Sequence, residues 1–165
     1  MVAKAIPKPD FMEQAEWDIL MTTREPEIIK AGARAHVKLY LDTDGGGTSY
    51  TTQGAPTLLL GTTGRRSGVE QIAPANFMQR GDDVIVVGSI AGLDRHPHWA
   101  LNLDANSEAW VQVKAKRWPV TAHRVLAGER AELWPRLTEY FPLWGHFQKY
   151  CDREFLVFVL SPKEA

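Results

Sequence analysis

The chain has 165 residues and a mass of 18.5 kDa, and 19 Lys and Arg stand against 20 Asp and Glu, a formal net charge of −1. This length fits one domain, 1–165, with a core that needs no disulfide. The balanced charge argues against a nucleic-acid partner, and a composition of 44% hydrophobic and 24% charged residues excludes a collagen, a coiled coil and general disorder. The single Cys151 excludes an internal disulfide and a cysteine-rich metal site.

We expect a cytoplasmic protein, because no apolar run approaches about 18 residues and the start of the chain lacks an export pattern. Residues 1–41 are predicted to be an N-terminal helical segment. Asp10 and Glu13 have the spacing of a capping box, which predicts a first helix from Asp10 onward. Pro26 suits the first turn of a second helix.

The second helix, residues 26–41, is predicted to be basic and amphipathic. Ile29, Ala33, Val37 and Tyr40 fall near one face, and Lys30, Arg34 and Lys38 follow at four-residue steps. Most helices of this kind pack on their own domain, and the alternative is peripheral contact with a membrane surface. A monomer is the expected state.

The rest of the chain is predicted to be mainly β. Strands are expected at residues 57–63, 71–78, 84–88, 109–114, 118–125 and 154–160, and helices at 98–103 and 128–140. Pro74 places the second strand at an edge or a bulge, and Lys116 and Arg117 are expected in a hairpin turn. About six mainly antiparallel strands without regular alternation with helices predict an α+β fold, a small closed β-barrel over 55–162 with N-terminal and peripheral helices.

The segment Gly61–Gly68 is the sharpest local motif. It places three glycines, two threonines, Arg65, Arg66 and Ser67 at a tight strand end, where backbone N–H groups and guanidinium groups can bind an anion. It lacks the Lys-Ser/Thr of a phosphate-binding P-loop. A solvated hairpin turn is the alternative interpretation.

A second polar segment follows the apolar strand at 84–88. Gly88-Ser89-Ile90-Ala91-Gly92 leads to a short helix, and strand ends of this kind are good places for backbone groups to meet a ligand. His96 and His98 flank Pro97, but only Asp94 offers a carboxylate nearby. A structural or cofactor-side pair is therefore favoured, and no metal is expected.

An aromatic run near the carboxyl end, Phe141–Phe147, is the third candidate. Tyr140, Trp144 and Phe147 stand at i, i+4 and i+7, which predicts one helical face. That face is either a core stripe or an aromatic wall over a flat ligand. Since neither a Gly-x-Ser-x-Gly elbow nor a local Cys-His pair occurs, a reaction carried by a bound cofactor, such as hydride transfer, fits best.

Four blocks of the chain, in order, resemble the deazaflavin-dependent nitroreductase family. They are TLLLGTTGRRSG from Thr57, GDDVIVVGS from Gly81, RHPHWALNLDAN from Arg95, and Asp152-Arg-Glu before the apolar strand Phe155–Leu160. The resemblance covers roughly residues 55–162. It implies a split β-barrel related to the pyridoxamine-phosphate oxidases, with the 8-hydroxy-5-deazaflavin coenzyme F-420 as hydride donor in a groove of the barrel.

The resemblance also implies roles for individual residues. Coenzyme binding falls on Arg65, Arg66, Ser67, Gln71, Pro74, Ala75, Asn76, Val87, Gly88, Ser89, Ile90, His98, Trp99 and Asn102. The substrate is expected against Asn76, Phe141, Trp144 and Phe147, with Ser89 and Trp144 as the catalytic candidates.

The chain departs from the family pattern at two places. Gln71-Ile72-Ala73 stands where members often have basic residues, which weakens the expected anion clamp. Phe141, Trp144 and Phe147 stand where nitroreductase-type members carry tyrosines, which removes a proton donor.

The resulting hypothesis is a reductase that transfers hydride from reduced F-420 to a small electron-poor acceptor: a quinone, an activated enone or a nitro compound. Two alternatives stay open. One is a barrel protein that binds lipid, haem or fatty acid without turnover, and the other is an FMN-dependent oxidoreductase.

Overall fold

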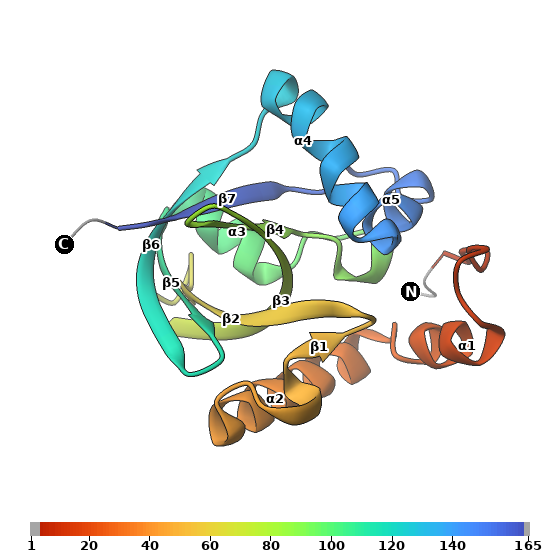
Figure 1. The fold of residues 1–165 in the computed structure, drawn as a ribbon, viewed down its shortest axis with the longest axis horizontal. Coiled ribbons are helices and arrows are strands. Elements are labelled where there is room, and N and C mark those ends of the chain that lie inside the picture. Colours follow the sequence, from red (N-terminus) through yellow and green to blue (C-terminus); the bar gives the residue numbers. More distant parts are fainter. Residues whose placement is uncertain (1–3, 164–165) are drawn as a thin grey trace.

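In the computed structural model, which describes residues 4–163, an antiparallel β-barrel occupies the centre and helices surround it (Figure 1). The strand order is β1-β2-β3-β4-β7-β6-β5, and a further pairing of β2 with β5 closes the barrel. The strands are β1 (Thr51–Thr52), β2 (Ala55–Thr63), β3 (Glu70–Arg80), β4 (Asp83–Val87), β5 (Glu108–Val113), β6 (Lys116–Arg124) and β7 (Val157–Pro162). The predicted α+β split barrel is confirmed.

Both faces of β4 are buried, which explains its continuous run of valine and isoleucine. Val84 and Val86 point into the barrel with Phe77, whereas Ile85 and Val87 pack on the outer side against the helices. A strand that alternates between two hydrophobic cores needs no polar face. The barrel interior and the layer outside it are therefore two clusters that share this strand.

The helices are α1 (Gln14–Thr22), α2 (Pro26–Thr43), α3 (His98–Ala105), α4 (Ala127–Tyr140) and α5 (Pro142–Lys149), with short 3-10 turns η1 (Gly47–Ser49) and η2 (Ile90–Gly92). The predicted start of the first helix is wrong. Asp10 lies in a turn, the N-cap is Glu13, and no side chain caps α1. Helix α1 buries Trp17 and Leu20, so tertiary packing outweighs the local capping pattern.

Helix α2 confirms the predicted inward face and is anchored on the barrel by Tyr40. This side chain is fully buried, its hydroxyl donates to the carbonyls of Thr57 (2.9 Å) and Gln112 (3.3 Å), and it accepts from the N–H of Lys114 (2.8 Å). The carboxyl end of α2 is thus tied to two strands of the barrel.

Two further strand predictions have different outcomes. Pro74 pairs with Leu59 of β2, while β4 pairs with β3 only at 77–80, so Pro74 lies at an edge as predicted. The β5–β6 turn is at Lys114 and Ala115, and not at Lys116 and Arg117. Lys114 has a φ of 55°. Asn or Gly usually occupies such a left-handed position, and because neither occurs at this turn, the sequence does not predict it.

Candidate active site

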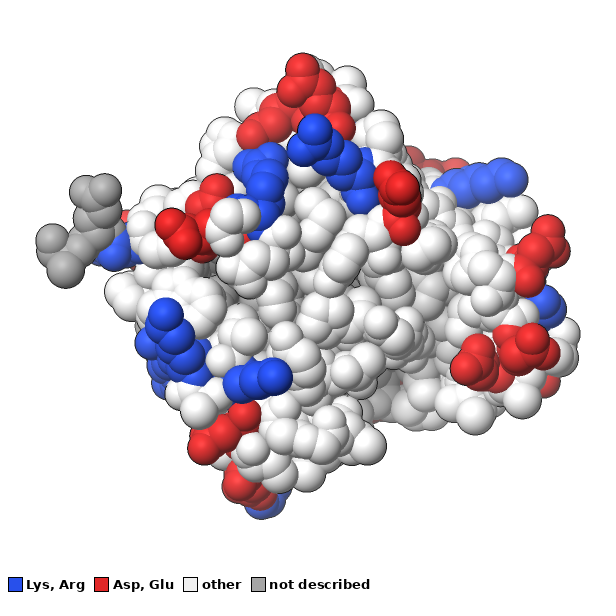
Figure 2. Space-filling view, viewed as in Figure 1, with Lys and Arg blue, Asp and Glu red and all other residues white. Residues whose placement is uncertain are grey.

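A groove of about 1110 Å³ runs between α2, strand β3, the connection from β4 to α3, and helix α5. Figure 2, in the same view as Figure 1, shows a broad uncharged area between α2 and α4, with charged side chains at the margins. This volume is slightly above the range of about 300–1,000 Å³ that is typical of small-molecule sites.

Most of the predicted site residues line this groove. They are Gln71, Pro74, Ala75, Asn76, Val87, Ser89, Ile90, His98, Trp99, Phe141, Trp144 and Phe147. They come from β3, the end of β4, the start of α3 and helix α5, and only the tertiary fold brings them together. Their predicted binding roles stay a proposal.

Five predicted residues do not line the groove: Arg65, Arg66, Ser67, Gly88 and Asn102. Asn102 is 1% exposed, and its side-chain hydrogen bonds connect α3 to the β2–β3 connection. Its Nδ2 donates to Thr62 Oγ1 (3.0 Å) and Gln71 Oε1 (2.9 Å), and its Oδ1 accepts from the backbone N–H (3.1 Å) and Nη1 (3.3 Å) of Arg65. The hydrogen-bonding groups of this amide are all paired within the protein, so Asn102 positions Arg65 and Gln71 instead of facing the groove.

Ser67 and Gly88 also have internal partners. The Ser67 hydroxyl accepts from the N–H of Val69 (3.2 Å), which closes the tight turn between β2 and β3. The N–H of Gly88 donates to the carbonyl of Leu156 (2.8 Å) and extends the β4–β7 ladder. Both residues shape the walls of the site.

One end of the groove is positively charged around His98. Partial desolvation, together with Arg65, Arg95, Arg66 and Lys30, lowers the pKa of this imidazole, which favours its neutral form. Lys30 and Arg95 line the groove themselves. The sequence interpretation assigned no ligand role to these two cations, because Lys30 lies on a helix whose basic face looked solvated.

A strained turn, Ser89–Gly92, forms the wall of the groove next to β4. Ser89 is right-handed helical (φ −77°, ψ −41°), and Ile90, Ala91 and Gly92 follow with φ angles of 41°, 52° and 69°. Positive φ costs a non-glycine residue about 1–3 kcal/mol. A right-handed residue before a left-handed one directs successive N–H groups to one side. Within residues 4–163, the N–H groups of Ile90 and Ala91 have no partner, so this turn can offer donors to a ligand oxygen.

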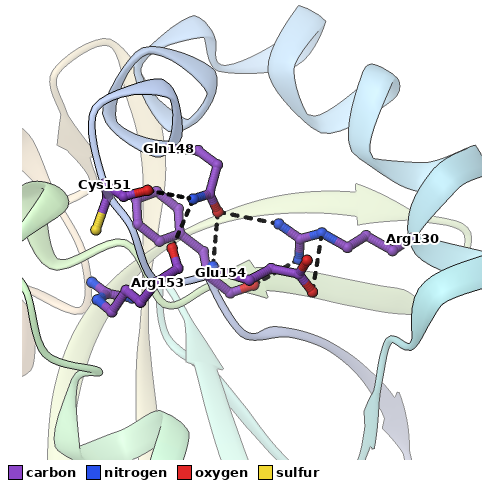
Figure 3. Close-up of polar contacts among 6 residues, drawn as sticks. Arg130, Gln148, Cys151, Arg153 and Glu154 are labelled. Carbon is purple, nitrogen blue, oxygen red and sulfur yellow. Dashed lines mark hydrogen bonds and ion pairs between the residues drawn. The ribbon is translucent and has the colours of Figure 1, made fainter.

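Arg153 holds the two ends of this turn. Its guanidinium donates to the carbonyls of Ser89 (2.7 Å), Leu93 (2.8 Å) and Gly88 (3.0 Å) and lies over the ring of Phe155. Burial lowers the pKa of Arg153, which stays charged. Figure 3 shows Arg153 at one side of a polar cluster that precedes β7. The sequence marked this residue only as part of the Asp152-Arg-Glu block.

The aromatic residues of α5 both line the groove and belong to a core. Trp144 is 2% exposed and packs edge to face on Phe141 (5.1 Å), and Phe147 stacks on Trp17 of α1. Tyr140 only borders this face. Helix α4 ends at Tyr140, the chain bends at Phe141, and the exposed Tyr140 ring lies 6.4 Å from the Trp144 ring without lining the groove. The wall that α5 gives to the groove therefore consists of well-packed rings and contains no phenol.

The polar groups near the wall are Asn76 and Ser89. The Nδ2 of Asn76 donates to the carbonyls of Thr52 (3.1 Å) and Ala55 (3.2 Å), which aims the amide at the β1–β2 turn. Ser89 is half-buried, and its hydroxyl has no partner within the described residues. No cluster of three or more His, Cys, Asp or Glu suited to a metal ion occurs between residues 4 and 163.

The family model for F-420H(2)-dependent quinone reductase matches residues 32–162. A Mycobacterium tuberculosis protein named for this activity is 35% identical over 108 residues, 66% of this chain and 91% of its own. A second M. tuberculosis protein, an F-420H(2)-dependent quinone reductase, is 32% identical over 131 residues, 78% of this chain and 88% of its own.

Among solved structures, an F-420-H2-dependent reductase (FDR-A) has a TM-score of 0.59 at 31% identity and covers 64% of this chain and 94% of its own. A haem storage protein of Vibrio cholerae, HutZ, has a TM-score of 0.50 at 18% identity over 66% of this chain and 82% of its own. The second similarity concerns the fold alone.

Proposed function

This chain belongs to the F-420H(2)-dependent quinone reductase family, and from that premise we propose that its groove brings reduced F-420 and a quinone face to face. The observation that carries the proposal is the division of the groove into a cationic end around His98 and an apolar, aromatic end at α5. An anionic coenzyme tail suits the first end, and a flat uncharged acceptor suits the second. When bound, the reduced deazaflavin supplies the hydride.

The residues present fit such a coenzyme. Ala73, Pro74 and Ala75 give the β3 wall a shallow surface on which a flat ring can lie. The unpaired N–H groups of the Ser89–Gly92 turn suit the oxygen atoms of a polar ring edge. Lys30 and Arg95, with Arg65 and Arg66 near His98, replace the basic residues absent at 71–73.

The acceptor is placed against Phe141, Trp144 and Phe147. These rings exclude water from the reacting faces, and their rigid packing holds the acceptor at a fixed height over the coenzyme. The Ser89 hydroxyl, or a water bound to it, donates a hydrogen bond to the oxygen on which negative charge develops and supplies the proton. Asn76, on strand β3 of the same groove, orients the acceptor through its amide oxygen.

We extend the proposal to the surface of α2. Ile28, Leu39 and Leu41 are 49%, 43% and 40% exposed on the helix that also carries Lys30, Arg34 and Lys38, a composition that suits peripheral contact with an anionic membrane. No helix within the described residues is long and apolar enough to cross a membrane. Contact through α2 would bring a lipid-soluble quinone close to the groove, which α2 lines.

Vesicle sedimentation tests this extension. A protein with Leu39→Ser and Leu41→Ser should bind anionic vesicles at least fivefold more weakly than the unchanged chain, with the same F-420 affinity. Leu126→Ser is the control, since Leu126 is a still more exposed leucine, at 64%, and lies at the start of α4 and not on α2. Equal vesicle binding by all three proteins would refute the proposed membrane contact through α2. Light scattering on the same samples tests the proposed monomer, and the location of the protein in fractionated cells tests the cytoplasm.

A titration tests the central proposal. Oxidised F-420 is added to the purified protein and its fluorescence followed, with FMN and NADPH as controls, and reduced F-420 is then oxidised in the presence of a soluble quinone. Selective saturable binding and quinone-dependent turnover are expected. Tight FMN binding with yellow colour, or a co-purified lipid or haem with no F-420 binding, would refute it.

A further inference from the structure

Arg24, between α1 and α2, reaches the site from a part of the chain that precedes the family match at 32–162. Its side chain is 5% exposed. The Nε group donates to the carbonyl of Ala91 (3.0 Å), and Nη1 donates to the carbonyl of Lys4 (2.9 Å). Arg24 thus joins the N-terminal segment 4–25 to the middle of the Ser89–Gly92 turn.

The two arginines on this turn have different positions. Arg153 takes the carbonyls at its ends, from Gly88, Ser89 and Leu93, whereas Arg24 takes the carbonyl of Ala91 at its apex. Three consecutive positive φ angles persist only where the surroundings enforce them. With one clamp alone, the apex would be free to relax.

The burial of Arg24 is itself unusual. Its Nη2 atom is buried and has no hydrogen-bond partner within residues 4–163. A charged group that leaves one donor unsatisfied is a poor way to fill space, because its desolvation is not fully compensated. Buried unsatisfied donors of this kind call for an explanation beyond packing.

The N-terminal segment also covers the outer side of the turn. Trp17 stacks on Phe147 at 6.1 Å, and a Cβ placed on Gly92 would lie 3.2 Å from Ile6 Cδ1. Leu20 and Thr23 line the groove. The segment is therefore in contact with the turn and with the acceptor wall.

We propose that Arg24 is a positioning residue of the reductase site: its hydrogen bond to Ala91 holds the N–H groups of Ile90 and Ala91 and the hydroxyl of Ser89 toward the groove. This inference rests on the proposed function. It assigns the N-terminal segment to the working site and not only to its surroundings. Arg24 touches neither the coenzyme nor the acceptor in this role.

The test compares Arg24→Met and Arg24→Lys with Arg130→Met. Arg130 is the control, because it is also a mostly buried arginine that donates to a backbone carbonyl, that of Phe155 at 2.6 Å (Figure 3). Unlike Arg24, it makes no hydrogen bond to the Ser89–Gly92 turn. Two quantities are measured on each full-length protein without a second ligand: the Kd for oxidised F-420, and the hydrogen exchange of the Ser89, Gly92 and Leu93 amides in the unliganded state. These three N–H groups donate to the carbonyls of Val87, Ser89 and Ile90, so their exchange reports the integrity of the turn.

Arg24→Met should raise the Kd at least tenfold and speed exchange of the Ser89, Gly92 and Leu93 amides at least tenfold. Arg24→Lys should retain part of both, since an ammonium can still donate to Ala91. Arg130→Met should leave both within twofold. Unchanged exchange in the Arg24 variants, or equal changes in Arg130→Met, would overturn the proposal. If Arg24→Met does not fold, Arg24→Lys should still raise the Kd and the exchange rate by more than the twofold allowed for Arg130→Met, and smaller changes would overturn the proposal. Absence of F-420 binding by the unchanged protein would overturn the proposed function, while the exchange rates would still show whether Arg24 holds the turn.

Discussion

Replacing Asn102 by Ala removes the side-chain hydrogen bonds between α3 and the β2–β3 connection. The lost contacts are the donors to Thr62 and Gln71 and the acceptor for the backbone and side chain of Arg65. A hydrogen bond between neutral groups contributes about 1 kcal/mol, and the exposed Arg65 side chain adds little because solvent screens it. Since Thr62 is 3% exposed and is left unpaired, the expected loss is about 2–4 kcal/mol.

For a chain of this length, each kcal/mol corresponds to roughly 2–4 °C in Tm, so thermal unfolding should shift downward by about 5–15 °C. The Kd for F-420 should rise about tenfold at the same time, because Arg65 and Gln71 lose their common support. Differential scanning calorimetry and the fluorescence titration measure the two effects.

Asn106→Ala is the control, since Asn106 is exposed at the end of the same helix and its Oδ1 accepts only from the nearby N–H of Glu108 (3.0 Å). Its Tm should fall by less than about 4 °C, with the Kd unchanged. If Asn102→Ala behaved like this control, the hydrogen bonds of Asn102 would not support the coenzyme site.

Three further predictions concern the groove. Trp144→Phe should raise KM for the quinone several-fold while the Kd for F-420 stays within twofold. Trp134→Phe, outside the groove, should change neither quantity. A change in the Kd for F-420 alone would show that Trp144 contacts the coenzyme and not the quinone. Because the pKa of His98 is lowered in the folded protein, its small contribution to stability is present above about pH 6.5 and is lost as the pH falls below it. Bound F-420 should raise the midpoint of the His98 NMR titration, since an anion nearby favours the charged imidazole. An unchanged midpoint would show that the anionic tail of the coenzyme does not bind near His98. Ala91→Gly relieves a φ of 52° and should raise the free energy of unfolding by about 1 kcal/mol in urea denaturation; a loss of stability would show that the turn is not strained.

The elements that follow from local pattern are those whose pattern reports burial directly. The continuous apolar run at 84–87 predicts a strand buried on both faces, and β4 indeed contributes to two cores. The apolar spacing of Ile29, Val37 and Tyr40 predicts the inward face of α2, and Pro26 marks its start. In each case the residues that make the pattern also make the contact.

Local signals fail where packing or backbone conformation decides. The spacing of Asp10 and Glu13 has the form of a cap, yet α1 begins at Gln14 because Trp17 and Leu20 determine which turn can reach the core. The β5–β6 turn lies at Lys114, where Tyr40 accepts the backbone N–H and stabilises a left-handed residue that the sequence does not favour. Asn102 looks like a ligand residue and is instead saturated within the protein.

By itself, the sequence determined the fold class and the family, because the blocks at strand ends carry the barrel. It also indicated the residues of β3, the end of β4, α3 and α5 that line the groove, but not the wall that α2 supplies. Only the tertiary structure decided how charge is gathered there. Lys30, Arg65 and Arg95 are far apart along the chain and meet around His98 through the packing of α2, β2 and α3 on one side of the barrel. The clamping of the Ser89–Gly92 turn by Arg24 and Arg153 has the same origin, since hydrogen bonds to backbone carbonyls depend on position and leave no pattern in the residues that accept them.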